Sequence, residues 1–169
     1  MRLKILTPVL CLIGMSLVAT TTQARTAQIN DAQGTVLGRA VLTQGSHGLN
    51  LRVRVKGLTP GGHGIHLHAV GKCEGPAFTS AGPHLNPAGK QHGLENPMGS
   101  HMGDLPNLIV KANGKADFKA TIHAGDMASV FDSDGSALII HAQSDDLKSD
   151  PTGNSGPRQA CAAFSSSGL

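Results

Sequence analysis

Apolar and polar residues alternate most clearly from Leu49 to Lys56, where leucine and valine at odd positions are followed by Asn, Arg or Lys at even ones. Side chains two apart on a strand share a face, so this pattern predicts a half-buried β-strand. A second β-type run, TVLGRAVLTQ, covers residues 35–44, and a glycine-rich turn from Gln44 to Gly48 separates the two runs. Together these features predict a β-hairpin.

The same arrangement recurs later in the chain. In NLIVKANGKADFKATI, Asn113 and Gly114 stand between two short β-type runs, and in SALIIHA a further run follows Asp134 and Gly135. Asn-Gly and Asp-Gly pairs are typical of tight turns between strands. No segment keeps a helical period, and the sequence contains 22 glycines. Several short strands with such turns predict an all-β protein, an antiparallel sandwich or barrel.

Two stretches lack any strand pattern. The first, between His68 and Asp104, is rich in Gly, Pro, Asn and His, and the second covers residues 143–158. Six of the nine histidines lie between His63 and His101. Long irregular loops in compact domains commonly carry function, so we expect the functional site in these two loops.

The N-terminus has the pattern of a secretory signal peptide. Two cations precede an apolar run over residues 5–19, and the small residues Thr22 and Ala24 follow. The alternative, a membrane anchor, needs about 20 uninterrupted apolar residues, whereas a proline, a glycine and a serine break this run. We therefore predict a signal peptide at 1–24, a single domain at 25–169, and a periplasmic or secreted mature protein.

Cleavage changes both the charge and the cysteine count. The full chain has 14 Lys+Arg and 11 Asp+Glu, and loss of Arg2 and Lys4 lowers its formal charge from +3 to about +1. This balance gives no support to nucleic-acid binding. Cys11 leaves with the signal peptide, so Cys73 and Cys161 remain in an oxidising compartment. One disulfide closing a long loop is the expected arrangement, with two free thiols as the alternative.

The segment GIHLHAV suggests metal binding. His66 and His68 would share one face of a strand, while Ile65 and Leu67 point into an apolar interior. Further candidate ligands follow along the chain: His84, His92, His101, Asp104 and His141. Six imidazoles and one carboxylate exceed the needs of one tetrahedral zinc ion, so we predict two metal sites. Imidazole nitrogen suits zinc and copper rather than calcium or magnesium.

Five segments resemble, in the same order and at comparable spacing, the signature segments of the copper/zinc superoxide dismutases: GIHLHAVGKC, TSAGPHLNPAGKQHG, GSHMGDLPNL, IIHAQSDDL and TGNSGPRQAC. The resemblance covers residues 34–164 and is closest to the exported bacterial branch. It implies a Greek-key antiparallel β-sandwich or flattened barrel, immunoglobulin-like, with two long functional loops.

The resemblance also implies a role for each site residue. Copper would be bound by the copper set, which is His66, His68, His84 and His141. Zinc would be bound by the zinc set, which is His84, His92, His101 and Asp104, so that His84 bridges the two metals. Asp145 would hydrogen-bond to one ligand of each metal. Arg158 would attract the anionic substrate from beside the copper, with Thr152 across the channel, and a Cys73–Cys161 disulfide would tie the first long loop to the last strand.

The implied reaction is the disproportionation of superoxide to molecular oxygen and hydrogen peroxide. Copper would cycle between oxidation states, zinc would hold geometry and charge, and His84 would supply a proton as peroxide forms. Superoxide is the expected partner, with no nucleic acid, no transmembrane anchor in the mature chain, and a monomer or homodimer. A metal buffer or chaperone on the same fold is the alternative. Zinc-dependent hydrolysis would need an open zinc position, which four ligands do not leave.

Some positions depart from the family pattern, with possible effects on substrate attraction: Ala69, Lys72, Leu147 and Pro157. Three further histidines match no ligand. His63 is expected to bond to loop backbone near the site, whereas His47 and His123 are expected to be solvated.

Overall fold

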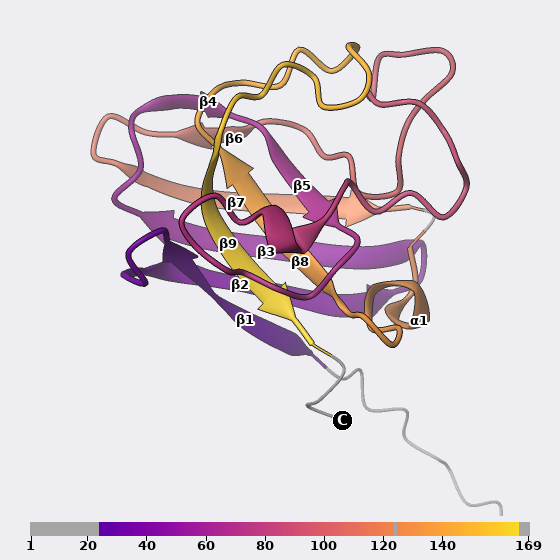
Figure 1. Cartoon of the computed structure of the whole chain (residues 1–169), viewed down its shortest axis with the longest axis horizontal. Coiled ribbons are helices and arrows are strands. Elements are labelled where there is room, and N and C mark those ends of the chain that lie inside the picture. Colours follow the sequence, from indigo (N-terminus) through magenta and orange to yellow (C-terminus); the bar gives the residue numbers. More distant parts are fainter. Residues whose placement is uncertain (1–23, 124, 166–169) are drawn as a thin grey trace, which may run out of the picture.

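The computed structural model describes residues 24–123 and 125–165, so the predicted signal peptide lies outside the described residues except for Ala24. Strands make up nearly all of the regular structure (Figure 1). In chain order the elements are β1 (Arg25–Asp31), β2 (Val36–Gly45), β3 (Gly48–Lys56), β4 (Gly61–His63), β5 (Ile65–His68), the 3-10 turn η1 (Thr79–Ala81), β6 (Leu108–Val110), β7 (Lys115–Ile122), α1 (Met127–Val130), β8 (Ser136–His141) and β9 (Arg158–Phe164).

The strands form one curled antiparallel sheet. Its order is β5-β8-β9-β1-β2-β3-β7, and β4 and β6 pair in a separate two-stranded sheet. This short sheet lies between the two edges of the large one, because Gly64 alone separates β4 from β5 and a turn joins β6 to β7. The sheet therefore curves back on itself as a flattened barrel, which confirms the predicted all-β class.

The first predicted hairpin is present, whereas at the second only the turn forms as predicted, because β6 pairs with β4 and β7 pairs with β3. In β3, Leu49, Leu51, Val53 and Val55 are buried, and the register with β2 ends at the Gly45–Gly48 turn. At the second turn, Gly114 has φ +72, a left-handed conformation that glycine adopts without steric cost.

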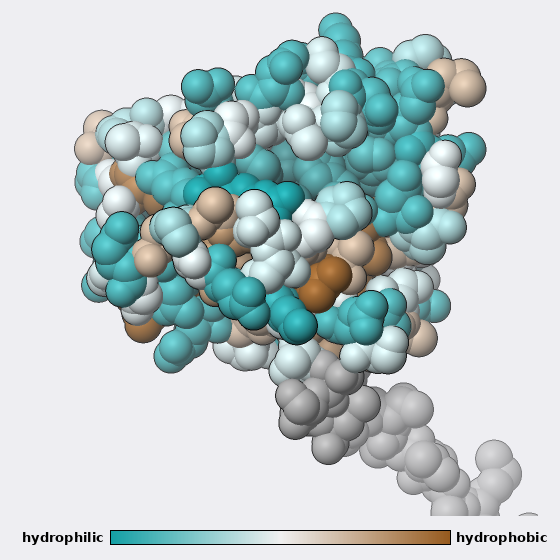
Figure 2. All heavy atoms as spheres, viewed as in Figure 1, coloured by the Kyte–Doolittle hydropathy of each residue, from teal (hydrophilic) through white to brown (hydrophobic). Residues whose placement is uncertain are grey.

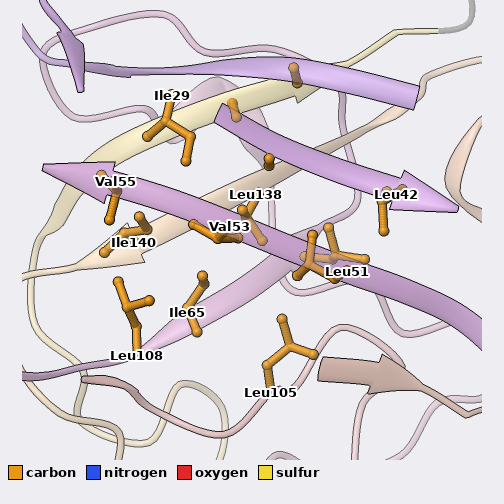
Figure 3. Packing of buried hydrophobic residues seen from close by; sticks show 14 of the residues in the cluster. Ile29, Leu42, Leu51, Val53, Val55, Ile65, Leu105, Leu108, Leu138 and Ile140 are labelled. Carbon is orange, nitrogen blue, oxygen red and sulfur yellow. The ribbon is translucent and has the colours of Figure 1, made fainter. Parts of the chain in front are cut away.

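The inner side chains of the two sides of the barrel meet in one apolar core (Figure 3). From β5 and β8, Ile65, Leu138 and Ile140 pack in the same cluster as Leu51 and Val53 of β3. Because side chains alternate along a strand, the burial of Ile65 and Leu67 in this core places His66 and His68 on the opposite side of β5. The core thus determines where these imidazoles point.

The two long loops pack against each other outside the sheet. The amide of Glu95 in the first loop donates to the Leu147 carbonyl in the second, at 2.9 Å. The chain around these loops, at the top of Figure 1, forms a largely hydrophilic surface in Figure 2. A disulfide joins Cys73 of the first loop to Cys161 of β9, as predicted, and closes a separation of 88 residues. In the chain-entropy account, a link of this length stabilises the fold by about 4–5 kcal/mol.

Several elements were not predicted from the alternation, among them β1 and α1. Strand β1 has only Ala27 and Ile29 as buried apolar residues, too few for a local signal, and it forms because it pairs with β2 and β9. The single turn of α1 begins at Asp126, whose carboxylate accepts from the Ser129 amide. Over residues 24–123 and 125–165, no helix has the length and apolar character to cross a bilayer.

Candidate metal centre

Strand pairing brings the copper set together. His66 and His68 lie on β5, His141 ends the neighbouring strand β8, and the loop residue His84 bridges to the backbone of His68. One nitrogen from each of the four rings lies within 4.8 Å of the others. All four side chains are buried. Three segments distant in sequence thus gather four imidazoles in one place.

Each ring of the copper set has one buried nitrogen with no hydrogen-bond partner. These atoms are Nδ1 of His66 and Nε2 of His68, His84 and His141. A buried polar atom without a partner is costly, and native proteins rarely leave one. Four such atoms pointing into one space are what a nitrogen-liganded metal ion requires.

Backbone carbonyls determine the tautomers of two of these rings. Nδ1 of His68 donates to the Gly82 carbonyl at 2.8 Å, and Nδ1 of His141 donates to the Gly156 carbonyl at 2.9 Å. A carbonyl only accepts, so the proton lies on Nδ1 and the lone pair on Nε2 faces the other imidazoles. Both rings are therefore oriented as ligands by the chain itself.

Burial keeps the imidazoles of His68, His84 and His141 neutral. It lowers the pKa of His68 to about 2, and the pKa values of His84 and His141 to about 4. A buried cation is poorly solvated, and the neighbouring imidazoles oppose a second positive charge. At neutral pH the lone pairs are free to bind a metal without first losing a proton.

The zinc set forms a second cluster around one carboxylate oxygen. Oδ1 of Asp104 lies 3.0 Å from Nδ1 of His84, 3.0 Å from Nδ1 of His92 and 3.2 Å from Nδ1 of His101. Nδ1 of His84 and Nδ1 of His101 are 3.3 Å apart. Four ligands about 2.0–2.1 Å from a tetrahedral zinc ion lie roughly 3.3 Å from one another. The donor types and their spacing fit zinc.

The other oxygen of Asp104 is used to orient the carboxylate. Oδ2 accepts from the amides of Gly93 at 2.9 Å and His101 at 3.0 Å. Burial raises the pKa of Asp104. Hydrogen bonds from His84, His92 and the Gly93 amide together lower this pKa by more than burial raises it, so the net shift is downward. Asp104 is therefore an anion with one oxygen directed at the three imidazoles.

Asp145 connects the two clusters. Its Oδ2 accepts from Nε2 of His66 at 2.5 Å and its Oδ1 from Nε2 of His92 at 3.1 Å. Burial alone would lower the pKa of His92, but the carboxylates of Asp104 and Asp145 outweigh it and raise that pKa to about 9. His92 consequently exchanges a proton for a metal at neutral pH.

Arg158 lies at the open side of the copper set. Its guanidinium donates to the carbonyls of Phe78 at 2.6 Å and Gly82 at 2.7 Å, both in the first long loop. Arg158 and Thr152 line one surface depression together with His68 and His141. Burial lowers the pKa of Arg158 from a very high ordinary value, so the group remains a cation facing this opening.

Several residues that hold the site were not found from the sequence. The side chain of Asn107 binds both the amide and the carbonyl of Asp145, at 2.8 Å each. The carboxylate of Asp150 accepts from the amide of His92. Gly82 and Gly156 act through their backbone carbonyls. Every residue has a carbonyl, so the residue type gives no sign of this role. Only the folded chain identifies them.

The other histidines behave as expected. His63 is buried, and its Nδ1 lies 2.7 Å from the His141 carbonyl while its Nε2 lies 2.9 Å from the Thr59 carbonyl. His47 and His123 are exposed. Of the departures, Leu147 has φ +62 and donates its amide to Asp145, so this position helps to hold the carboxylate through its backbone.

Comparison with known proteins gives a consistent result. Residues 36–164 match the family model described as copper/zinc superoxide dismutase (SODC). The Cu-Zn superoxide dismutase 2 of Aquifex aeolicus is 40% identical over 141 residues, which are 80% of this chain and 82% of the relative. The crystal structure of a SOD-like protein from Bacillus subtilis has a TM-score of 0.78 at 39% identity, covering 82% of this chain and 97% of that one. The Cu/Zn superoxide dismutase from Brucella abortus has a TM-score of 0.71 at 29% identity, covering 83% and 99%.

Proposed function

The chain belongs to the copper/zinc superoxide dismutase family and catalyses the disproportionation of superoxide, and from that premise we propose which residues perform each part of the reaction. The copper set binds copper and the zinc set binds zinc, with His84 shared between them. Two superoxide anions and two protons give one molecule of oxygen and one of hydrogen peroxide. Copper supplies the one-electron redox chemistry, and zinc supplies charge and geometry.

The four unpartnered nitrogens of the copper set carry this proposal. A metal buffer would need affinity alone, and its ligands could be exposed and mobile. Here each of His66, His68 and His141 is oriented by a hydrogen bond at its other ring nitrogen. Such preorganisation favours a site that must keep its geometry through repeated turnover, and so favours the enzyme over the buffer.

His84 is the residue suited to move a proton. Its Nδ1 faces Asp104 at 3.0 Å, within the zinc set, and its Nε2 faces the copper set without a partner. When Nε2 is not engaged as a ligand, it can take up a proton and transfer it to the peroxide product. Its Nδ1 stays in the zinc set meanwhile and keeps the ring in place, so the donor atom returns to the same position.

Arg158 positions the substrate. Its two hydrogen bonds to the carbonyls of Phe78 and Gly82 attach the guanidinium to the first long loop. They hold its positive charge beside His68 and His141. A fixed cation at the entrance raises the local concentration of a small anion and orients it. The Cys73–Cys161 disulfide anchors the same loop to the strand that begins with Arg158.

We also propose that the mature protein works outside the cytoplasm after removal of residues 1–24. The disulfide supports an oxidising compartment. Mass spectrometry of the intact protein recovered from the culture fluid and the periplasmic fraction tests this, because a mature chain should begin near Arg25.

The test of the metal assignment is to load the purified chain with copper and zinc and to measure bound metals and superoxide disproportionation in the same sample. His141→Ala should lose copper and activity but keep zinc, whereas His47→Ala, in an exposed histidine, should behave as the wild type. Full activity in His141→Ala contradicts the copper assignment. Full metal loading of the wild type without activity would favour the metal-buffer alternative.

A further inference from the structure

The outward side of the sheet opposite the metal centre is strongly basic. We define the basic face by its seven cations: Arg39, Arg52, Arg54, Lys56, Lys111, Lys115 and Lys119. Among the described residues that line the two depressions, Asp117 is the one carboxylate. Seven cations and one anion give this face a formal charge of about +6, whereas the other five cations and ten carboxylates after Ala24 leave the rest of the chain at about −5. The nearly neutral mature chain is therefore strongly polarised.

The sheet register places like charges directly opposite one another. Arg39 pairs with Arg54 between β2 and β3, and between β3 and β7 Arg52 pairs with Lys119. Along the same face, Arg54 lies opposite Asp117, a pair of opposite charge, and Lys56 with Lys115 is again two cations. Like charges at directly opposed positions destabilise a sheet, and a sequence selected for stability alone would avoid three such pairs.

Most of these charges have no internal counter-ion. Asp117 forms ion pairs with Arg52 at 2.9 Å and with Arg54 at 3.3 Å. Among the described residues, Arg39 and Lys119 have no ion pair with any carboxylate. The positive charge of the basic face is thus available to an external anion.

The basic face has two adjoining depressions. They share Arg39 and Arg54, and their lining residues extend across β2, β3 and β7. Hydroxyl and amide groups also line one of them, from Thr43, Asn50 and Thr121. Cations accompanied by neutral hydrogen-bonding side chains suit a ligand that carries both anionic groups and hydroxyls.

We propose that the basic face binds a linear acidic polysaccharide. Two adjoining depressions that cross three strands fit an extended chain better than a planar bilayer. The sequence has no Trp or Tyr, and the phenylalanines on β7 and β9 pack on the core side of the sheet. The basic face therefore lacks the aromatic side chains on which the bases of a single-stranded nucleic acid would stack. Sugar hydroxyls match the threonines and the asparagine, and uronate or similar acidic groups match the cations.

Binding there would leave the enzyme free to work. Arg52 and Arg54 alternate with Leu51 and Val53, whose side chains enter the core, and His66 and His68 lie beyond that core on the far side of β5. A polymer on the basic face and superoxide at Arg158 therefore approach from opposite sides. The enzyme would be retained at an anionic matrix with its substrate opening toward solvent.

The test is to measure binding of the metal-loaded protein to polygalacturonate by titration in low-salt buffer, with uncharged dextran as the control polymer. Arg39→Gln/Lys119→Gln removes two unpaired cations of the face and leaves Asp117 paired. Lys72→Gln/Lys90→Gln removes the same charge elsewhere and is the matched control. Each lost cation removes one contact with the polymer and the counterion release that accompanies this contact. Binding should therefore weaken by about tenfold or more in the first variant, and by less than about twofold in the control.

Thermal stability gives a second readout. Because the face variant relieves two opposed like-charge pairs, it should have a higher Tm than the control variant, and polygalacturonate should raise the Tm of the wild type but not of the face variant. Superoxide turnover should be the same in the face variant as in the wild type. Absence of binding, equal loss in both variants, or tighter binding of the wild type to oligo(dT) or to phosphatidylglycerol vesicles would overturn the proposal.

Discussion

The carboxylate of Asp145 accepts a hydrogen bond from Nε2 of His66 at 2.5 Å, and both side chains are buried. The bond leaves Nδ1 of the imidazole as the atom that faces the copper set. A buried anion placed behind a ligand raises the basicity of that ligand and determines its orientation. The second long loop thus controls the metal centre without contributing a ligand of its own.

Replacing Asp145 with Asn should weaken metal binding by about 10- to 100-fold, since the amide lacks the charge that orients His66 and His92. The neighbouring Asp146→Asn is the matched control, because that carboxylate is exposed and bonds within its own loop to Lys148, Ser149 and Asn154. Competition with a chelator gives the affinities. Equal metal retention in the two variants would show that Asp145 has no role in orienting the ligands.

Gly153 should tolerate no side chain. A Cβ atom there would lie 1.8 Å from Oδ1 of Asp145 and 2.6 Å from Nε2 of His92. Gly153→Ala should therefore lose metal and stability. Gly89→Ala is a close control, because Gly89 has φ +61 against +62 at Gly153 but nothing within 4 Å. Its cost should be only the backbone strain of about 1–2 kcal/mol, with metals retained. Urea unfolding and metal analysis of both variants measure this, and matching losses would contradict the steric argument.

Arg158 should influence rate rather than metal content. Arg158→Ala should slow superoxide disproportionation and flatten its dependence on ionic strength, because the fixed cation at the opening is lost. Arg158→Lys keeps the charge but cannot make both hydrogen bonds to Phe78 and Gly82, so its rate should be intermediate. Pulse radiolysis at several salt concentrations provides the rates. An unchanged salt profile in Arg158→Ala would argue against steering by this residue.

The metal-free protein should be most stable near pH 6.5. Burial lowers the pKa of His84 and His141 to about 4, so between pH 6.5 and 4 the unfolded chain binds more protons and stability falls as the pH falls. The pKa of His92 is raised to about 9, so its contribution is full below pH 6.5 and is lost as the pH rises to about 9. Urea unfolding of the chelator-treated protein across this range tests both limbs. Constant stability from pH 6.5 to 4.5 would mean that the imidazoles are not buried as neutral groups.

The sequence by itself determined the local features of this protein. The alternation from Leu49 to Lys56 predicted a strand with one buried face, because the period of two belongs to the strand and needs no partner. Likewise, the spacing of His66 and His68 predicted two imidazoles on one face. The order of the signature segments was enough for the family and its reaction, both of which the comparisons confirm.

Tertiary structure decided what depends on contacts between distant segments. Strand β1 exists through its pairing with β2 and β9, and the tautomers of the copper set depend on carbonyls that any residue could supply. The basic face is also a product of register. Arg39 and Arg54 are 15 positions apart, and only the alignment of β2 with β3 makes them neighbours. Alternation is set by the local backbone, whereas register and loop contacts are set by the packing of the whole chain.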